Sequence, residues 1–217
     1  MPRKIAFYGG SFDPIHLGHL TPARALIKQF LLDEFVFIPA FHAPHKLRQK
    51  PTSAFHRFAM LCSATADDER IKVSTIEVEL PEKPFTINTL SRLKVALPND
   101  EIYFVMGADS WNDILTWRDW EKVLLLTNHI IVTRPGHEIR FDHVGDKVRN
   151  VIVDLRRIPL LSPLLPNESP KIYISDVVNL EISATAIRRN IIDALPGWRE
   201  EVPVQVANYI EKYQIYR

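Results

Sequence analysis

Gly9 to His19 reads GGSFDPIHLGH. This segment joins a short apolar run, Ile5 to Tyr8, to a run with apolar residues at helical spacing, Leu20 to Leu31, and it therefore predicts a strand, a tight turn and a helix. Two adjacent glycines at the end of a strand let the backbone adopt positive φ and approach a ligand closely. Asp13 and Pro14 are typical of the start of a helix, where free N–H groups and the helix dipole favour a phosphate.

His16 and His19 lie three residues apart, on neighbouring positions of one face of the predicted helix. Their imidazoles add hydrogen-bonding groups whose charge can be tuned near neutral pH. A Gly-Gly turn or two surface histidines would each be ordinary alone, but together they favour a site for a nucleoside triphosphate. Zinc is not expected, because no cysteine or third ligand follows at the usual spacing. Neither G-x-G-x-x-G nor G-x-x-x-x-G-K-[ST] occurs here.

The chain has 217 residues, of which 46% are hydrophobic and 24% are charged, so it can fill the core of one globular domain. We expect residues 1–217 to form a single domain in which residues 180–217 make a C-terminal helical portion. The net charge of +1 gives no general attraction to nucleic acid or to an anionic membrane. The single cysteine, Cys62, cannot form an intrachain disulfide and fits a reducing cytosol. No signal peptide or apolar segment of membrane-spanning length is visible, so a cytoplasmic protein is expected.

Short apolar runs rich in aromatic and β-branched residues alternate with helical patterns along the chain. This order predicts an α/β fold with a Rossmann-like parallel sheet flanked by helices on both faces. Ligands of such sheets bind at the carboxyl ends of the strands, so the loops there should share one crevice with Gly9 and His19. After the first strand, the predicted strands are Glu34 to Pro39, Ile71 to Leu80, Glu101 to Met106, His129 to Thr133 and Lys171 to Ile174, and the closing helix is Pro203 to Tyr213.

The second predicted helix follows Thr52 or Ser53, either of which could cap it. His56 and Arg57 lie on the flank of this helix, at the surface unless the helix borders the site. Further along, one amphipathic segment is expected over Asp142 to Val153, and residues 137–170 carry no chemical motif. The face of the second helix predicted to enter the core is Phe55, Phe58, Leu61 and Cys62.

Three positions that follow predicted strands should face the crevice. The loop after the second strand carries His45 and Lys46, although its basic residues could also be simply solvated. Asp109 comes soon after Gly107, at the end of a buried strand, where it could contact a ligand or cap the next turn. Arg134 ends another strand and could hold an anion in fork geometry.

Two predicted helix starts and one aromatic residue complete the candidates. Thr86 is a plausible N-cap, and a cap is its ordinary interpretation. Ser183, Thr185 and Arg188 form a capped helix start with a basic flank, a pattern that is often only structural. Trp117 offers an indole face that can stack on a flat heteroaromatic ring.

Residues 16–19 match the H-x-G-H motif of the nucleotidylyltransferase superfamily, and the preceding GGSFDP resembles its bacterial nicotinate-nucleotide adenylyltransferase branch. Three departures from the family pattern are Ala43 for a proline, Phe85 for a tyrosine and Trp111 for an aliphatic residue. The resemblance implies a nucleotidylyltransferase fold and transfer of AMP from ATP to nicotinate mononucleotide. The later matching segments are APHK at 43–46, FTINTL at 85–90, GADS at 107–110, TW at 116–117, RPG at 134–136 and ISATAIR at 182–188.

The resemblance also implies roles for single residues. His16, His19, Lys46 and Arg188 would neutralise the charge on the phosphorus and on the departing pyrophosphate. The residues expected to contact ATP are Gly9, Gly10, Ser11, Phe12, His16, Gly18, His19, Gly107, Asp109, Ser183, Thr185 and Arg188. Those expected to contact nicotinate mononucleotide are Ser11, His45, Lys46, Thr86, Trp117, which would stack on the nicotinate ring, Arg118, hypothesised to hold its carboxylate, and Arg134.

No side chain is arranged as a nucleophile, because Cys62 sits within a helix and no serine lies in a nucleophile-elbow motif. The phosphate of the mononucleotide is therefore expected to attack ATP directly. Mg²⁺ is expected as a cofactor held mainly by the phosphates, with no metal site made of protein ligands. The alternatives are another nucleotidylyltransferase, for example one that prefers the amide mononucleotide, and a non-catalytic nucleotide-binding module. The near-neutral charge disfavours a nucleic-acid binder.

Overall fold

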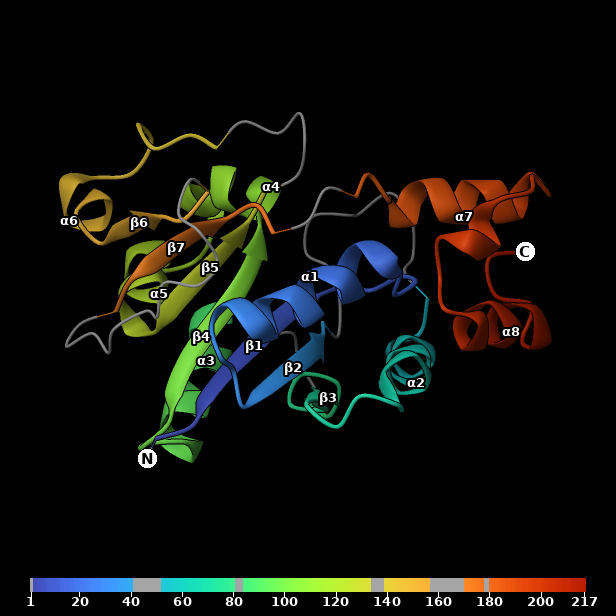
Figure 1. Ribbon diagram of the computed structural model, residues 1–217, viewed down its shortest axis with the longest axis horizontal. Coiled ribbons are helices and arrows are strands. Elements are labelled where there is room, and N and C mark those ends of the chain that lie inside the picture. Colours follow the sequence, from blue (N-terminus) through green and yellow to red (C-terminus); the bar gives the residue numbers. More distant parts are fainter. Residues whose placement is uncertain (1, 41–51, 81–83, 134–138, 157–169, 178–179) are drawn as a thin grey trace.

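The computed structural model describes residues 2–40, 52–80, 84–133, 139–156, 170–177 and 180–217. These residues form a seven-stranded sheet with strand order β3-β2-β1-β4-β5-β7-β6, and every neighbouring pair of strands is parallel (Figure 1). The predicted parallel α/β fold is therefore confirmed. The strands are β1 (Lys4–Gly10), β2 (Glu34–Pro39), β3 (Ile71–Val73), β4 (Glu101–Gly107), β5 (Asn128–Val132), β6 (Ile152–Asp154) and β7 (Ile172–Ser175).

Helices cover both faces of the sheet. The strands are therefore buried on both sides, and alternate residues along a strand enter two different cores. The helices are α1 (Leu17–Gln29), α2 (Ala54–Thr65), α3 (Thr86–Ala96), α4 (Ala108–Asn112), α5 (Trp120–Leu126), α6 (Asp146–Arg149), α7 (Ala184–Ile192) and α8 (Val204–Lys212), with 3₁₀ turns η1 (Ile114–Thr116) and η2 (Trp198–Glu200). Along β1, Ala6 belongs to a core that also contains residues of α1, α2, α7 and α8, whereas Ile5 and Phe7 belong to a core with residues of α3, α4, α5 and α6.

The edges of the sheet differ from the sequence prediction. Strand β3 ends at Val73 rather than Leu80, because the chain turns at Ser74, whose Oγ accepts a hydrogen bond from the N–H of Ile76. Strand β6 was missed: its three residues pair with one side of β7, and they begin in the last two residues of the segment predicted to be amphipathic. A half-exposed edge strand of three residues has too few positions to show a period of two.

The face of α2 that enters the core is also different from the predicted one. Phe55 is 71% exposed and Cys62 is exposed, whereas Arg57 is only 1% exposed. The buried positions of the helix are Ala54, Arg57, Met60, Leu61 and Thr65, a stripe at helical spacing with an arginine inside it. The prediction followed hydrophobicity alone, so it was correct for Leu61 but wrongly placed the exposed Phe55 and Cys62 in the core and left out Arg57.

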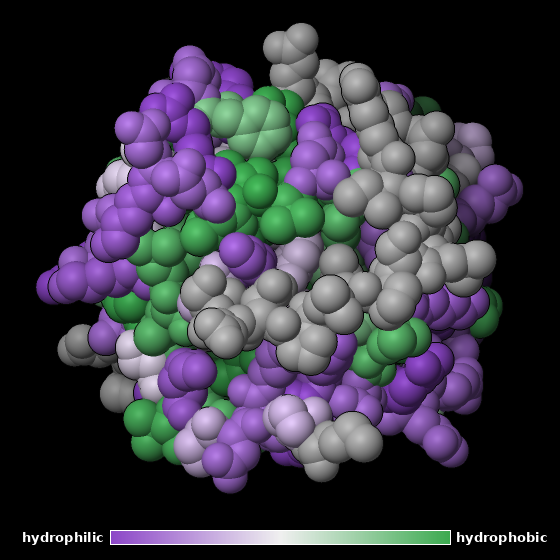
Figure 2. Space-filling view, turned by 60° about the vertical axis from the view of Figure 1, so that its left-hand side comes forward, coloured by the Kyte–Doolittle hydropathy of each residue, from purple (hydrophilic) through white to green (hydrophobic). Residues whose placement is uncertain are grey.

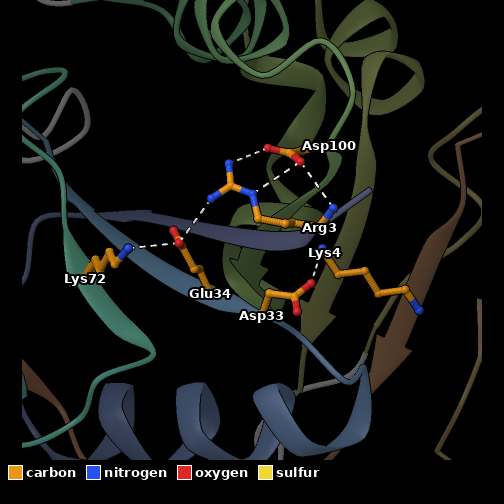
Figure 3. A network of polar contacts seen from close by, with 6 residues as sticks. All are labelled: Arg3, Lys4, Asp33, Glu34, Lys72 and Asp100. Atoms are coloured by element: carbon orange, nitrogen blue, oxygen red, sulfur yellow. Dashed lines mark hydrogen bonds and ion pairs between the residues drawn. The ribbon is translucent and has the colours of Figure 1, made fainter. Parts of the chain in front are cut away.

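The amino ends of the strands are joined by surface charges. The guanidinium of Arg3 contacts Asp100 at 2.6 Å and Glu34 at 3.3 Å, and Glu34 also pairs with Lys72 at 2.8 Å (Figure 3). The hydrogen bond from Arg3 lowers the pKa of Asp100. These contacts join β1, β2, β3 and the turn before β4 at the amino ends of the strands, opposite the end where the sequence predicts a ligand.

The surface seen from the side of α5 and α6 carries a band of hydrophobic side chains bordered by hydrophilic ones (Figure 2). Within the described ranges, no helix combines the length and the apolar character needed to cross a membrane.

The burial of His129 in β5 predicts that the stability of the protein depends on pH. The side chain is fully buried, its Nδ1–H donates to the carbonyl of Thr127 at 2.9 Å, and burial lowers its pKa from 6.5 to about 4. The unfolded chain therefore binds an extra proton between pH 6.5 and 4, and stability falls as the pH falls through this window. Between pH 7 and 5 we expect this group to remove about 2 kcal/mol from the free energy of unfolding.

Urea unfolding at pH 7 and pH 5 measures that loss, with His129→Leu as the matched variant. The variant lacks the titrating group, so its free energy of unfolding should fall by about 2 kcal/mol less than that of the wild type over the same interval. An equal pH dependence in both proteins would show that His129 does not titrate as its burial requires.

Candidate active site

The loop after β1 is shaped by close aromatic packing. Phe12 is buried and has φ of +47°, and its ring lies so close to Gly10 that a Cβ there would be 2.8 Å from the ring's Cζ. A Cβ on Gly9 would be 3.3 Å from the ring of Phe104. The predicted positive φ at the glycines is wrong, since Phe12 adopts it instead. The glycines are needed because two rings lie against the backbone.

His16 and His19 lie beside each other at the start of α1. Their ring centroids are 3.7 Å apart with the planes tilted by 33°, and His16 is only 1% exposed. His16 occupies the N-cap position, so the helix begins at Leu17 and not at Asp13 and Pro14, which form a turn before it. A Cβ on Gly18 would lie 2.9 Å from Nδ1 of His16, so only glycine leaves room for this ring.

The start of α7 meets this loop from the other end of the chain. Nη1 of Arg188 donates to the carbonyl of Asp13 at 2.7 Å, and Nη2 reaches the hydroxyl of Thr185 at 3.3 Å. A Cβ on Gly18 would also lie 3.3 Å from Cβ of Ile182, one residue before the N-cap Ser183. The structure therefore brings residues 182–188 against the loop that carries the two histidines.

The carboxyl ends of the central strands meet in the same region. A small cavity of about 20 Å³ is lined by residues of β1, α1, β4 and β5 together with Leu180. Gly107 borders this cavity, and a Cβ there would have no atom within 4 Å. Asp109 lies in the first turn of α4 and is exposed. Residues near the carboxyl ends of β1, β4 and β5 thus border one cavity, at the end of the sheet where ligands of parallel sheets bind.

The candidate mononucleotide residues lie around the start of α3 and the end of η1. Thr86 is the first residue of α3, and the residue before it, Phe85, lies 4.7 Å beneath the guanidinium carbon of Arg118. Trp117 is half-buried and meets the ring of Phe104 edge-on at 6.4 Å. Since Phe104 also borders Gly9, its ring links this group to the loop after β1. His45, Lys46 and Arg134 lie outside the described residues.

Trp111 has a structural explanation. Its side chain is fully buried, and its indole N–H donates to the carbonyl of Arg140 at 2.6 Å. The imidazole of His143 lies edge-on to the same indole and bonds the carbonyl of Trp111 at 3.1 Å. The buried tryptophan thus anchors residues 139–144 onto α4.

Arg57 is buried at the border of the site, which is the alternative to a surface position that the sequence left open. Its guanidinium donates to three carbonyl oxygens, those of Ser11 and Ala40 at 2.6 Å and that of Thr52 at 3.0 Å. Burial lowers its pKa, while the nearby Asp13 favours the charged form. The only signal in the sequence was its place at helical spacing from Ala54 and Leu61 on the buried stripe.

Comparison with known proteins places this geometry among nucleotidyl-transferring enzymes. The model of the cytidylyltransferase-like family matches residues 7–190. Proteins named probable nicotinate-nucleotide adenylyltransferase from Desulfitobacterium hafniense and Thermus thermophilus are each 35% identical to this chain, over 216 and 214 residues. These alignments cover 100% and 99% of this chain and 97% and 100% of the relatives.

A solved structure supports the fold independently. The nicotinic acid mononucleotide adenylyltransferase of Plasmodium falciparum, complexed with NaAD, superposes with a TM-score of 0.73. It is 22% identical, and the match covers 99% of this chain and 97% of that chain. At this identity the likeness establishes the shared architecture, a Rossmann-like nucleotidylyltransferase fold.

Proposed function

This chain belongs to the cytidylyltransferase-like family, and we propose that it transfers AMP from ATP to nicotinate mononucleotide, giving nicotinate adenine dinucleotide and pyrophosphate in NAD biosynthesis. The observation that carries the proposal is the meeting of His16 and His19 with Arg188 around one loop. Imidazoles and a guanidinium gathered at the start of a helix suit a triphosphate. The names of the relatives that match over the full length of the chain identify the proposed substrates.

The chemistry is a single displacement at phosphorus. An oxygen of the mononucleotide phosphate attacks the α-phosphorus of ATP, a new P–O bond forms, and the bond to the β-phosphate oxygen breaks to release pyrophosphate. Holding the two substrates in line can contribute as much as ~7–11 kcal/mol to lowering the barrier. We assign His16, His19, Lys46 and Arg188 to stabilising the charge that develops on the transferring and departing phosphates.

Nucleotidyltransferases of this kind use a divalent metal, and we propose Mg²⁺ bound to the ATP phosphates. The described part of the chain has no group of three or more His, Cys, Asp or Glu side chains placed to hold a metal ion. A metal that arrives with ATP and is held by phosphate oxygens requires no such group. We also expect the reaction to take place in the cytoplasm.

Binding of the nicotinate part is proposed at Thr86, Trp117 and Arg118. The indole of Trp117 offers a flat face for the pyridine ring, and Arg118 carries a positive charge for its carboxylate. We expect Arg118→Ala to raise the KM for nicotinate mononucleotide about tenfold and to leave the KM for ATP unchanged. Arg189→Ala is the control, because Arg189 is an exposed arginine of α7 paired with Asp193. An unchanged KM for the acid mononucleotide would remove Arg118 from the site.

The test of the function is the steady-state rate of pyrophosphate release with the acid and amide mononucleotides side by side. The proposal predicts rapid release with ATP and the acid and much slower release with the amide. Preference for the amide would indicate a different adenylyltransferase of the superfamily. ATP binding without turnover on either substrate would instead support a non-catalytic nucleotide-binding module.

A further inference from the structure

The last residues of the chain reach back to the loop that carries the histidines. The hydroxyl of Tyr216 donates to one carboxylate oxygen of Asp13 at 2.6 Å, although the two residues are 203 positions apart. The other carboxylate oxygen accepts the N–H of Thr52 at 3.2 Å. The main-chain carbonyl of Asp13 accepts the bond from Arg188 described above. Asp13 therefore connects three distant segments at a position three residues before His16.

The C-terminal segment after α8 is folded so that Tyr216 points inward. Gln214 and Tyr216 both adopt positive φ, at +52° and +71°, and the N–H of Ile215 bonds the carbonyl of Ile210 at 3.0 Å. Ile215 is buried, and the ring of Tyr216 packs against the same core as α1 and α2. Residues other than glycine keep such a backbone only where surrounding contacts hold it.

The carboxylate of Asp13 is held by hydrogen bonds from two other segments of the chain. It is only 7% exposed, and both of its oxygens accept hydrogen bonds from the protein. A carboxylate held in this way fixes the loop between Phe12 and His16. The bond from Arg188 to the carbonyl of the same residue places the proposed phosphate-binding guanidinium against that loop. Any loosening of Asp13 would therefore displace His16 and Arg188 together.

We propose that Tyr216 is a positioning residue for the adenylyl transfer, whose hydroxyl holds Asp13 and through it His16 and Arg188 in their reactive arrangement. This inference rests on the proposed function. Burial, with the charge of Asp13 beside it, raises the pKa of Tyr216, so the phenol keeps its proton and remains a donor in neutral and mildly alkaline solution. A buried hydrogen bond to a charged group is a strong constraint, and the ring of a phenylalanine could fill the same space without providing it.

The first test replaces Tyr216 by phenylalanine, which removes only the hydroxyl. We expect kcat to fall about tenfold, while the KM values for ATP and the mononucleotide change less than twofold. Tyr213→Phe is the matched control, because Tyr213 lies three residues earlier, is 50% exposed, and should retain full kcat. Rates are measured at 25 °C per folded molecule, with circular dichroism and the melting temperature recorded for each variant. A normal kcat in Tyr216→Phe, even with a lower melting temperature, would reduce the residue to a structural role and overturn the proposal.

The second test asks whether Tyr216 acts through Asp13. In an Asp13→Ala background, which has no side-chain acceptor for the hydroxyl, Tyr216→Phe should lower kcat less than twofold further. A full tenfold further loss would show that the two residues act independently and would contradict the inference. Different results would refute the proposed function and the role of Tyr216. A wild-type chain that releases no pyrophosphate refutes the proposed function, whereas an active wild type with an equally active Tyr216→Phe refutes only the role of Tyr216.

Discussion

Replacing His19 by alanine is expected to lower kcat by about 10²–10³-fold while the fold persists. The imidazole lies on the first turn of α1 beside His16, where the proposed triphosphate develops negative charge during transfer. A preorganised donor at such a point stabilises the transition state by roughly 3–4 kcal/mol, and alanine supplies no substitute. The side chain is only partly buried and meets Phe12 edge-on at 5.1 Å, so its loss should cost the fold little.

Initial rates of pyrophosphate release under saturating substrates measure this effect, and circular dichroism reports the fold. His56→Ala is the matched control, since His56 lies on α2 and bonds the hydroxyl of Tyr209 at 3.0 Å, away from the crevice. That variant should keep the wild-type kcat. A folded His19→Ala protein with near wild-type turnover would refute the role assigned to the imidazole.

Replacing Arg57 by methionine is expected to destabilise the protein by roughly 3–5 kcal/mol. Methionine fills much of the same space but leaves the carbonyls of Ser11, Ala40 and Thr52 without the guanidinium that they accept from. Two of these carbonyls follow β1 and β2 at the crevice, so the surviving folded molecules should also have a reduced kcat. The free energy of unfolding of Arg57→Lys should lie between those of the wild type and Arg57→Met, because a single ammonium cannot reach three carbonyls in fork geometry.

Equilibrium unfolding in urea, with pyrophosphate release measured below the transition, tests both parts of this prediction. The matched control is Arg24→Met, because Arg24 is an exposed arginine of α1 that pairs with Asp68 at 3.6 Å. Its substitution should change the free energy of unfolding by less than about 1 kcal/mol. A loss of the same small size in Arg57→Met would mean that the three carbonyls do not depend on the buried guanidinium.

The sequence was sufficient to predict the parts of the fold whose signals are local. The first strand, the turn and α1 follow from one apolar run, the glycines and one helical period, and the alternation of strands and helices implied the parallel sheet. Two local details failed for physical reasons: Phe12, not a glycine, adopts positive φ, and the helix starts at Leu17. Edge strand β6 was missed because three half-exposed residues show no pattern.

The residues of the candidate site also fall into those that have a local signal in the sequence and those that have none. The motif around His16 and His19 and the segment at Arg188 could be found in the sequence, because each is a short string of residues with a recognisable pattern. Arg57 and Tyr216 could not, since their roles depend on carbonyl and carboxylate groups that only the folded chain brings to them. A buried arginine in particular contradicts its usual surface preference, and only its partners explain it.

A crystal structure with a non-hydrolysable ATP analogue would show whether groups from both ends of the chain bind one triphosphate. We expect the imidazole of His19 and the guanidinium of Arg188 both to lie within hydrogen-bonding distance of the phosphate oxygens. A triphosphate bound elsewhere, for example in the groove between α3 and α5 beside Ser91 and Lys122, would contradict this expectation.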